Sequence, residues 1–343
     1  MINLQELPNK QLTVQSILVL FILANLKGLF LVIAIQTYGP TLYPSFLTKP
    51  WVLRALGSAT LILATTATFN AFGATSTSTS SGRIVPTPLY GVTVDDISRL
   101  TDITQSLGKL PKMPTTRIVF DENVAPSYYR NAAVAINKVS YVMGEVLDSF
   151  YVNTISVPGY IDRTKQYLNA LSDVVDIWEI GNEINGEWLG RNDDVVAKMS
   201  GAYDLVKSQN KTAALTLYYN QDCWSNESNE MFTWANANVP YRMKTGLDYV
   251  FISYYEADCN GLKPDWPVVF QKLSVMFPNS KIGFGETGST SRTEKASYLT
   301  RYYTMKINVP KYVGGYFWWY FRQDMVPYTK AMWSTLNSAI SAP

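Results

Sequence analysis

Residues 175–183 have the sequence VDIWEIGNE, an apolar, β-rich run that ends abruptly in Gly-Asn-Glu. A second run, residues 281–286 with the sequence KIGFGE, ends in Glu286 in the same way. Parallel strands that are buried on both faces have near-continuous apolar sequences, so both runs predict such strands. A carboxylate that follows an amide side chain at the end of a strand is typical of catalysis rather than of packing. Each of the two strands is therefore expected to deliver a carboxylate to one face of the fold.

Segments of strand and helix character alternate along residues 86–343, on either side of these two runs. We expect strands at 89–94, 116–120, 140–147, 175–180, 213–219, 247–255, 281–285 and 312–321, and helices at 96–107, 126–139, 160–174, 193–208, 230–237, 265–277, 293–306 and 328–340. Eight βα units in this length predict an α/β fold of the (β/α)8, or TIM-barrel, type. A doubly wound open sheet is the alternative, but no glycine-rich phosphate-binding loop follows the first strand.

The composition narrows the chemistry. The chain has 343 residues, 47% of them hydrophobic and 16% charged, which is enough for one large domain or two ordinary ones. The net charge of +2 gives no reason to expect a nucleic-acid partner. The sequence contains no His, which excludes Ser-His-Asp and Cys-His triads and the usual catalytic zinc sites. Acid/base chemistry must then fall to Asp, Glu, Tyr, Lys or Cys. We expect no cofactor and no catalytic metal, and a structural Ca²⁺ stays open.

Residues 1–74 form a hydrophobic region that differs from the rest of the chain. Apolar stretches run from 18 to 35 and from 55 to 74, and the second resembles a secretory signal that begins some fifty residues late. Three explanations stay open: a start codon assigned too early, a two-helix membrane anchor, or a long cleaved leader. The anchor would associate with a membrane through residues 14–72, although Lys27 is costly near the centre of a span. All three place the rest of the chain outside the cytoplasm, secreted or anchored.

Residues 75–85 are expected to be a flexible linker, because residues 75–82 consist almost entirely of Ser and Thr. The linker separates the N-terminal region from the barrel domain, residues 86–343. The chain has two cysteines, Cys223 and Cys259, which the predicted fold places in neighbouring loops after the fifth and sixth strands. We expect them to form a disulfide, with two free thiols as the alternative. An oxidised pair would indicate an exported protein.

Several strand ends carry ionisable or polar groups. The second strand has Arg117, the fourth ends in Asn182 and Glu183, the sixth carries Tyr255, and the seventh ends in Glu286. A buried charge without a partner is expensive, so such a ring indicates a site rather than a core. In barrel enzymes the active site lies at the C-terminal ends of the strands.

This pattern resembles the large clan of retaining glycoside hydrolases with a (β/α)8 barrel, in which Asn-Glu ends the fourth strand and a second Glu ends the seventh. The resemblance covers residues 86–343. It implies that Glu183 is the acid/base, whose pKa is raised by a neighbouring carboxylate, and that Glu286 is the nucleophile. It also implies that Asn182 binds the 2-hydroxyl of the substrate and that Arg117 keeps the nucleophile ionised.

The resemblance also implies roles for residues on the sixth and eighth strands. A Tyr at the end of the sixth strand touches the nucleophile in related enzymes, and we prefer Tyr255 to Tyr254 for this role. Many relatives carry a His two residues earlier, where this chain has Ser253. A Trp at the end of the eighth strand forms the floor of the sugar site. Only one of two consecutive residues faces inward, and we prefer Trp318 to Trp319.

Further side chains are candidates for substrate binding. Trp188 and Trp224, in the loops after the fourth and fifth strands, are candidate platforms for additional sugars. Glu256 is a candidate ligand of substrate hydroxyls, and Glu179 is expected to pair with a Lys or Arg. The sequence thus predicts a monomeric, exported, retaining O-glycoside hydrolase that cleaves β-linked oligo- or polysaccharides, with endo action favoured. The alternatives are a non-catalytic glycan-binding barrel and a transglycosylase that remodels a polysaccharide.

Overall fold

The computed structural model describes residues 83–342. The hydrophobic region 1–74 and residues 75–82 of the expected linker lie outside the described residues. Within residues 83–342, no helix is long and apolar enough to cross a membrane.

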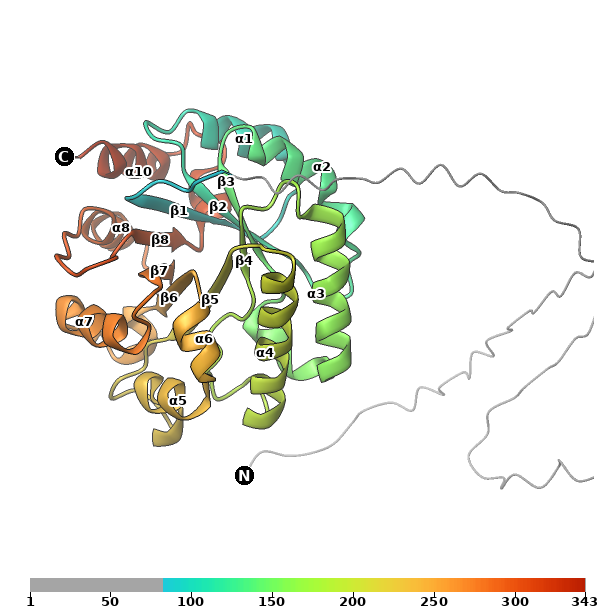
Figure 1. Cartoon of the computed structure of the whole chain (residues 1–343). Helices are drawn as coiled ribbons and strands as arrows, with labels where there is room; N and C mark the ends of the chain where they lie inside the picture. The colour runs from blue at the N-terminus through green and yellow to red at the C-terminus, as the bar shows by residue number, and fades with distance from the viewer. Residues whose placement is uncertain (1–82, 343) are drawn as a thin grey trace, which may run out of the picture. The chain divides into compact units, whose positions relative to one another are not determined.

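Eight parallel strands form a closed barrel in chain order, which confirms the TIM-barrel prediction. Figure 1 shows the strands at the centre, with the helices around them. The strands are β1 (Leu89–Val94), β2 (Thr115–Val119), β3 (Tyr141–Glu145), β4 (Ile177–Glu179), β5 (Ala213–Tyr218), β6 (Tyr249–Tyr254), β7 (Lys281–Thr287) and β8 (Gly314–Trp318). All eight overlap the strands expected from the sequence, and β1 has the expected bounds.

Each strand is followed by at least one helix. The helices are α1 (Leu100–Gly108), α2 (Pro126–Asn137), α3 (Val157–Leu171), α4 (Asn192–Ser208), α5 (Met231–Asn238), α6 (Tyr241–Gly246), α7 (Trp266–Met276), α8 (Lys295–Tyr303), α9 (Phe321–Met325) and α10 (Ala331–Ser341). Local sequence explains several starts, because Pro lies in the first turn of α2, α3 and α7, and Asp265 accepts a hydrogen bond from Val268 N at 3.3 Å.

The eighth strand is shorter than the sequence predicts. It was expected to reach residue 321, but it ends at Trp318, and Phe321 begins the short helix α9. Phe321 is fully buried. A continuous apolar run cannot distinguish a buried strand from a buried helical turn, which explains the error.

The barrel interior is apolar at one level and polar at the next. Met143, Ile177 and Phe251 lie in a buried cluster that is separate from the larger core containing the helices. Because side chains alternate along a strand, the next inward positions toward the C-terminal ends are two residues further on. Those positions carry Glu145 on β3 and Glu179 on β4. The polar layer therefore lies on an apolar plug.

The first described residues, 83–85, lie at the other end of the barrel, near the starts of β3 and β4. Arg83 donates to the Oδ1 atom of Asp176 at 3.0 Å and to the carbonyl oxygens of Asn137 and Ser140 at 2.9 and 3.1 Å. These partners precede β3 and β4, and Val85 is buried against the apolar plug. Arg83 and Val85, at the end of the expected linker, thus pack against the domain.

Candidate active site

The fully buried guanidinium of Arg117 lies at the centre of the polar layer. It extends from β2 and forms ion pairs with the carboxylates of three other strands. Its Nη2 atom donates to Glu286 of β7, its Nε atom lies 3.4 Å from Glu145 Oε2, and its Nη1 atom lies 3.5 Å from Glu179 Oε1. A single positive charge therefore faces three carboxyl groups. Glu179 pairs with an Arg, as expected.

Glu286 is held from two sides. One carboxylate oxygen accepts the hydrogen bond from Arg117, and the other accepts one from the hydroxyl group of Tyr255 at 2.5 Å. Tyr254 points the other way and donates to the carbonyl oxygen of Leu262 at 2.6 Å. The hydrogen bonds from Arg117 and Tyr255 together fix the orientation of the Glu286 carboxylate.

Glu183 is held by two serine hydroxyls. Ser253 donates to its Oε1 atom at 2.6 Å and Ser149 to its Oε2 atom at 2.8 Å. Burial, and then the charge of Glu286, raises the pKa of Glu183 from its ordinary value of 4.5 to about 8. Glu183 also has a left-handed backbone, with φ of 49°, in the turn that follows β4. Such strain in a non-glycine residue is common at functional sites.

Glu145 and Glu179 form a second, deeper pair of acids. They are opposite each other in the register of β3 and β4, and both are completely buried. Burial raises the pKa of Glu145 well above its ordinary value and that of Glu179 to about 7. Neither oxygen of Glu145 has a hydrogen-bond partner within residues 83–342. Burial thus disfavours the charged form of both deeper acids, and the charge of Arg117 acts in the opposite direction.

Asn182 is buried beside Glu183, with 2% of its surface exposed. Its Oδ1 atom has no hydrogen-bond partner among the described residues. A buried amide oxygen without a partner is costly, so this atom is available to a ligand hydroxyl.

The preference for Trp318 over Trp319 is wrong. Trp318 is fully buried in the layer between barrel and helices, where its indole N–H donates to Asp324 at 3.1 Å. Trp319 instead lies against the guanidinium of Arg117, with 5.3 Å between the guanidinium carbon and the ring centre. The inward neighbour Phe317 belongs to the apolar plug and sets this alternation.

The structure does not offer Glu256 to a substrate. Its carboxylate forms an ion pair with Arg301 of α8 and accepts a hydrogen bond from the hydroxyl group of Tyr302 at 3.2 Å. Both partners come from the helix layer, and the side chain is 15% exposed. Glu256 therefore anchors the turn after β6 to α8.

Trp188 and Trp224 lie in the loops after β4 and β5 and are 39% and 37% exposed. Glu187 ties the two loops together, because its carboxylate accepts the N–H groups of Ser225 and Asn226 at 2.7 and 2.8 Å. The ring of Trp188 also meets the edge of Tyr218, with 5.4 Å between centres. The loops that carry Trp188 and Trp224 therefore form one connected surface, the braced wall.

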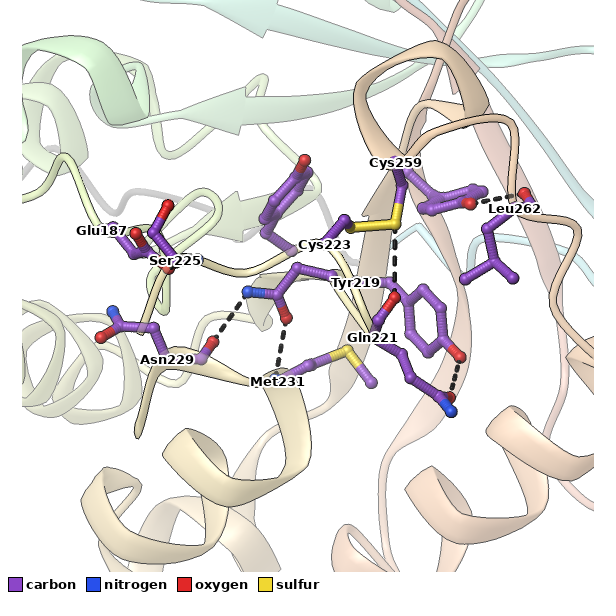
Figure 2. Close-up of a disulfide and its surroundings, with 12 residues drawn as sticks. Glu187, Tyr219, Gln221, Cys223, Ser225, Asn229, Met231, Cys259 and Leu262 are labelled. Atoms are coloured by element: carbon purple, nitrogen blue, oxygen red, sulfur yellow. Dashed lines mark hydrogen bonds between the residues drawn. A yellow bond between two sulfur atoms is a disulfide. The ribbon is translucent and has the colours of Figure 1, made fainter. Parts of the chain in front are cut away.

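The expected disulfide between Cys223 and Cys259 is present, with a Cα–Cα distance of 5.1 Å. Figure 2 shows that it joins the loop after β5 to the turn after β6, with Glu187 and Ser225 nearby. It extends the bracing across a third loop. Within residues 83–342, no group of three or more His, Cys, Asp or Glu side chains is arranged to hold a metal ion.

Two contributors were not singled out from the sequence, and a third, Trp319, was the rejected alternative. Glu145 is the last residue of β3, and Glu286 is the last but one of β7, so the same rule about strand ends could have found Glu145. Ser149 follows β3 in a short 3-10 helix (Ser149–Thr154), and nothing in its local sequence indicates a contact with Glu183.

Comparisons with known proteins give only distant likenesses. No protein-family model matches the chain, and no curated protein matches its sequence. Among solved structures, Saccharomyces cerevisiae Gas2p in complex with laminaritriose and laminaritetraose is 12% identical, with a TM-score of 0.47. That match covers 74% of this chain and 65% of the other. Gas2p in complex with laminaripentaose is 13% identical, with a TM-score of 0.49 over 75% and 66% of the two chains. Likenesses of this size say nothing about the reaction.

Proposed function

We propose that this protein is a retaining glycoside hydrolase that cleaves β-linked glycans through a covalent glycosyl–enzyme intermediate. The observation that carries the proposal is the contrast between two neighbouring carboxyl groups. Glu183 is held by two serine hydroxyls and has a pKa of about 8, whereas Glu286 is held by Arg117 and Tyr255. Two carboxyl groups in opposed environments are the arrangement that an acid and a nucleophile require.

In the first step, an oxygen of Glu286 attacks the anomeric carbon while Glu183 gives its proton to the departing glycosidic oxygen. The carbon–oxygen bond breaks, the leaving group departs as an alcohol, and Glu286 becomes a glycosyl ester. Glu183, now a carboxylate, removes a proton from water, which attacks the same carbon and releases Glu286. The free amide oxygen of Asn182 would bind the 2-hydroxyl, and Trp319 would form the floor of the sugar site.

Transglycosylation is the second candidate, and the braced wall favours it. The acid protonates the leaving group, so the sugars that depart lie on the side of Glu183. Trp188 is on that side, because Ser149 joins it to Glu183, and Glu187 and the disulfide hold its loop and the loop of Trp224 together. A preorganised platform lowers the entropic cost of binding a sugar acceptor, which then competes with water. The same wall favours endo action on a polymer.

The disulfide also supports an extracytoplasmic location, since such bonds persist in oxidising compartments. The expected partner is an oligo- or polysaccharide, and we propose that a monomer suffices because every side chain of the site comes from one barrel.

The test is turnover on a panel of aryl β-glycosides and polysaccharides, with laminari-oligosaccharides included because Gas2p was solved with them. Glu286→Gln should abolish turnover. Glu183→Ala should be slow, and added azide should restore its turnover of activated aryl glycosides. NMR of the first product should show retention at the anomeric carbon, and initial inversion would contradict double displacement. Mass spectrometry separates longer transfer products from hydrolysis. Glycan binding without any turnover would identify a non-catalytic barrel.

A further inference from the structure

The acid/base is connected by hydrogen bonds to an exposed aromatic ring. The indole N–H of Trp188 lies 3.2 Å from Ser149 Oγ, which in turn lies 2.8 Å from Glu183 Oε2. Ser149 is 4% exposed, whereas Trp188 is 39% exposed. A buried serine therefore joins the acid to the wall on which departing sugars are proposed to rest.

The chemistry of the three groups fixes the direction of these bonds. An indole N–H can only donate, so Ser149 Oγ must accept from Trp188. The serine hydroxyl has one hydrogen of its own, and Glu183 Oε2 is its one acceptor within residues 83–342. A proton on Oε2 would compete with that hydrogen for the lone pairs of one buried oxygen, and the hydroxyl oxygen of a carboxyl group is a weaker acceptor than its carbonyl oxygen.

Ser253 is not constrained in this way. Its Oγ atom lies 2.6 Å from Glu183 Oε1, and among the described residues no other hydrogen bond fixes the direction of its hydroxyl. It can accept a hydrogen from a protonated Oε1 or donate to an ionised one. Ser253 is also opposite Glu286 in the register of β6 and β7, so Oε1 is the oxygen on the nucleophile's side.

We propose that Ser149, locked as a donor by Trp188, is a positioning residue that keeps the transferable proton of Glu183 on Oε1, facing the scissile bond. This inference rests on the proposed function. The proton leaves Oε1 for the glycosidic oxygen, and the hydroxyl of Ser253 then turns to donate to the carboxylate. Ser149 donates to Oε2 throughout both steps.

The test compares two leaving groups on the wild type, Ser149→Ala and Trp188→Phe. The probes are 2,4-dinitrophenyl and phenyl β-glycosides of the sugar that the wild type accepts, and kcat/KM reports the first chemical step. Dinitrophenolate leaves without a proton, whereas phenolate needs one. In Ser149→Ala, kcat/KM should fall roughly 10- to 100-fold for the phenyl glycoside and stay within about threefold for the dinitrophenyl one. Trp188→Phe, which keeps a ring but loses the N–H, should show a smaller loss of the same kind.

The pH profile is an independent readout. The hydroxyl of Ser149 lowers the pKa of Glu183, so its removal should raise that pKa and move the alkaline limb of kcat/KM to higher pH. Equal losses on both leaving groups with an unmoved limb would overturn the inference while leaving the proposed function intact. A wild type without turnover on any glycoside would instead overturn the proposed function, and this inference with it.

Discussion

Replacing Glu183 by Gln should abolish cleavage of glycosides whose leaving group needs a proton and still make the protein more stable at alkaline pH. The folded protein disfavours the charged form of Glu183, because the carboxyl group is buried and faces Glu286. An amide of the same shape removes this penalty. Its oxygen can accept from Ser149, and its NH₂ group can donate to Ser253. The variant thus keeps both hydrogen bonds and loses only the charge.

The size and sign of the effect follow from the pKa. The pKa of Glu183 is about 8 in the folded protein and 4.5 ordinarily. At about 1.4 kcal/mol for each pKa unit, that difference corresponds to roughly 5 kcal/mol. Between these two values the folded state holds a proton that the unfolded state has lost, so the stability of the wild type falls as pH rises from about 4.5 to about 8. The variant lacks this loss.

The assay is thermal unfolding of the full chain at pH 5 and pH 9. Glu183→Gln should melt close to the wild type at pH 5 and on the order of 10 °C higher at pH 9. Glu187→Gln is the matched control with the opposite sign. Burial raises the pKa of Glu187, but the N–H groups of Ser225 and Asn226 together lower it by more. Replacing Glu187 should therefore reduce stability at pH 9. A gain for Glu183→Gln that is the same at both pH values would refute the reasoning.

Two further variants test the surroundings of the glutamate pair. Glu145→Gln should keep activity within about threefold at pH 6 and melt higher than the wild type at pH 9, because burial raises the pKa of Glu145 and disfavours its charged form. Loss of activity at pH 6 would show that its charge is needed. Gly288→Ala should lower kcat/KM by roughly tenfold or more, because its new Cβ would lie 2.7 Å from the ring of Tyr255, which donates to Glu286; Gly108→Ala, whose Cβ would lie 3.4 Å or more from its neighbours, is the control.

The sequence predicted the barrel because it rests on two patterns that can be recognised locally, the apolar runs and the glutamates at their ends. Apolar runs marked the eight strands, and glutamates at the ends of the fourth and seventh runs marked one face. Glu183 and Glu286 therefore meet for a reason that strand order alone supplies. Arg117 could be placed in the same way, since it lies on a neighbouring strand and any charge within the barrel needs a partner.

The direction in which a side chain points was harder to predict than its place along a strand. Residues 317–320 are four consecutive aromatics, so the sequence has no alternation from which to infer which ring faces inward. The packing of Phe317 into the apolar plug decides it, and this depends on the opposite strands. The pairing of Glu256 could not be predicted for a related reason. Its partner Arg301 lies 45 residues later in the sequence and in the helix layer. Pairings of this kind depend on tertiary geometry.

The absence of histidine gives the polar layer a particular dependence on pH. Arg117 brings one positive charge to three carboxyl groups, and burial raises the pKa of Glu145 and that of Glu179, the latter to about 7. The proposed acid, Glu183, has its pKa raised to about 8 by burial and by the charge of Glu286. In the proposed mechanism, activity should therefore fall as pH rises through about 8, where Glu183 loses its proton. A buried carboxyl group would then set an alkaline limit in the pH range where histidine side chains usually titrate.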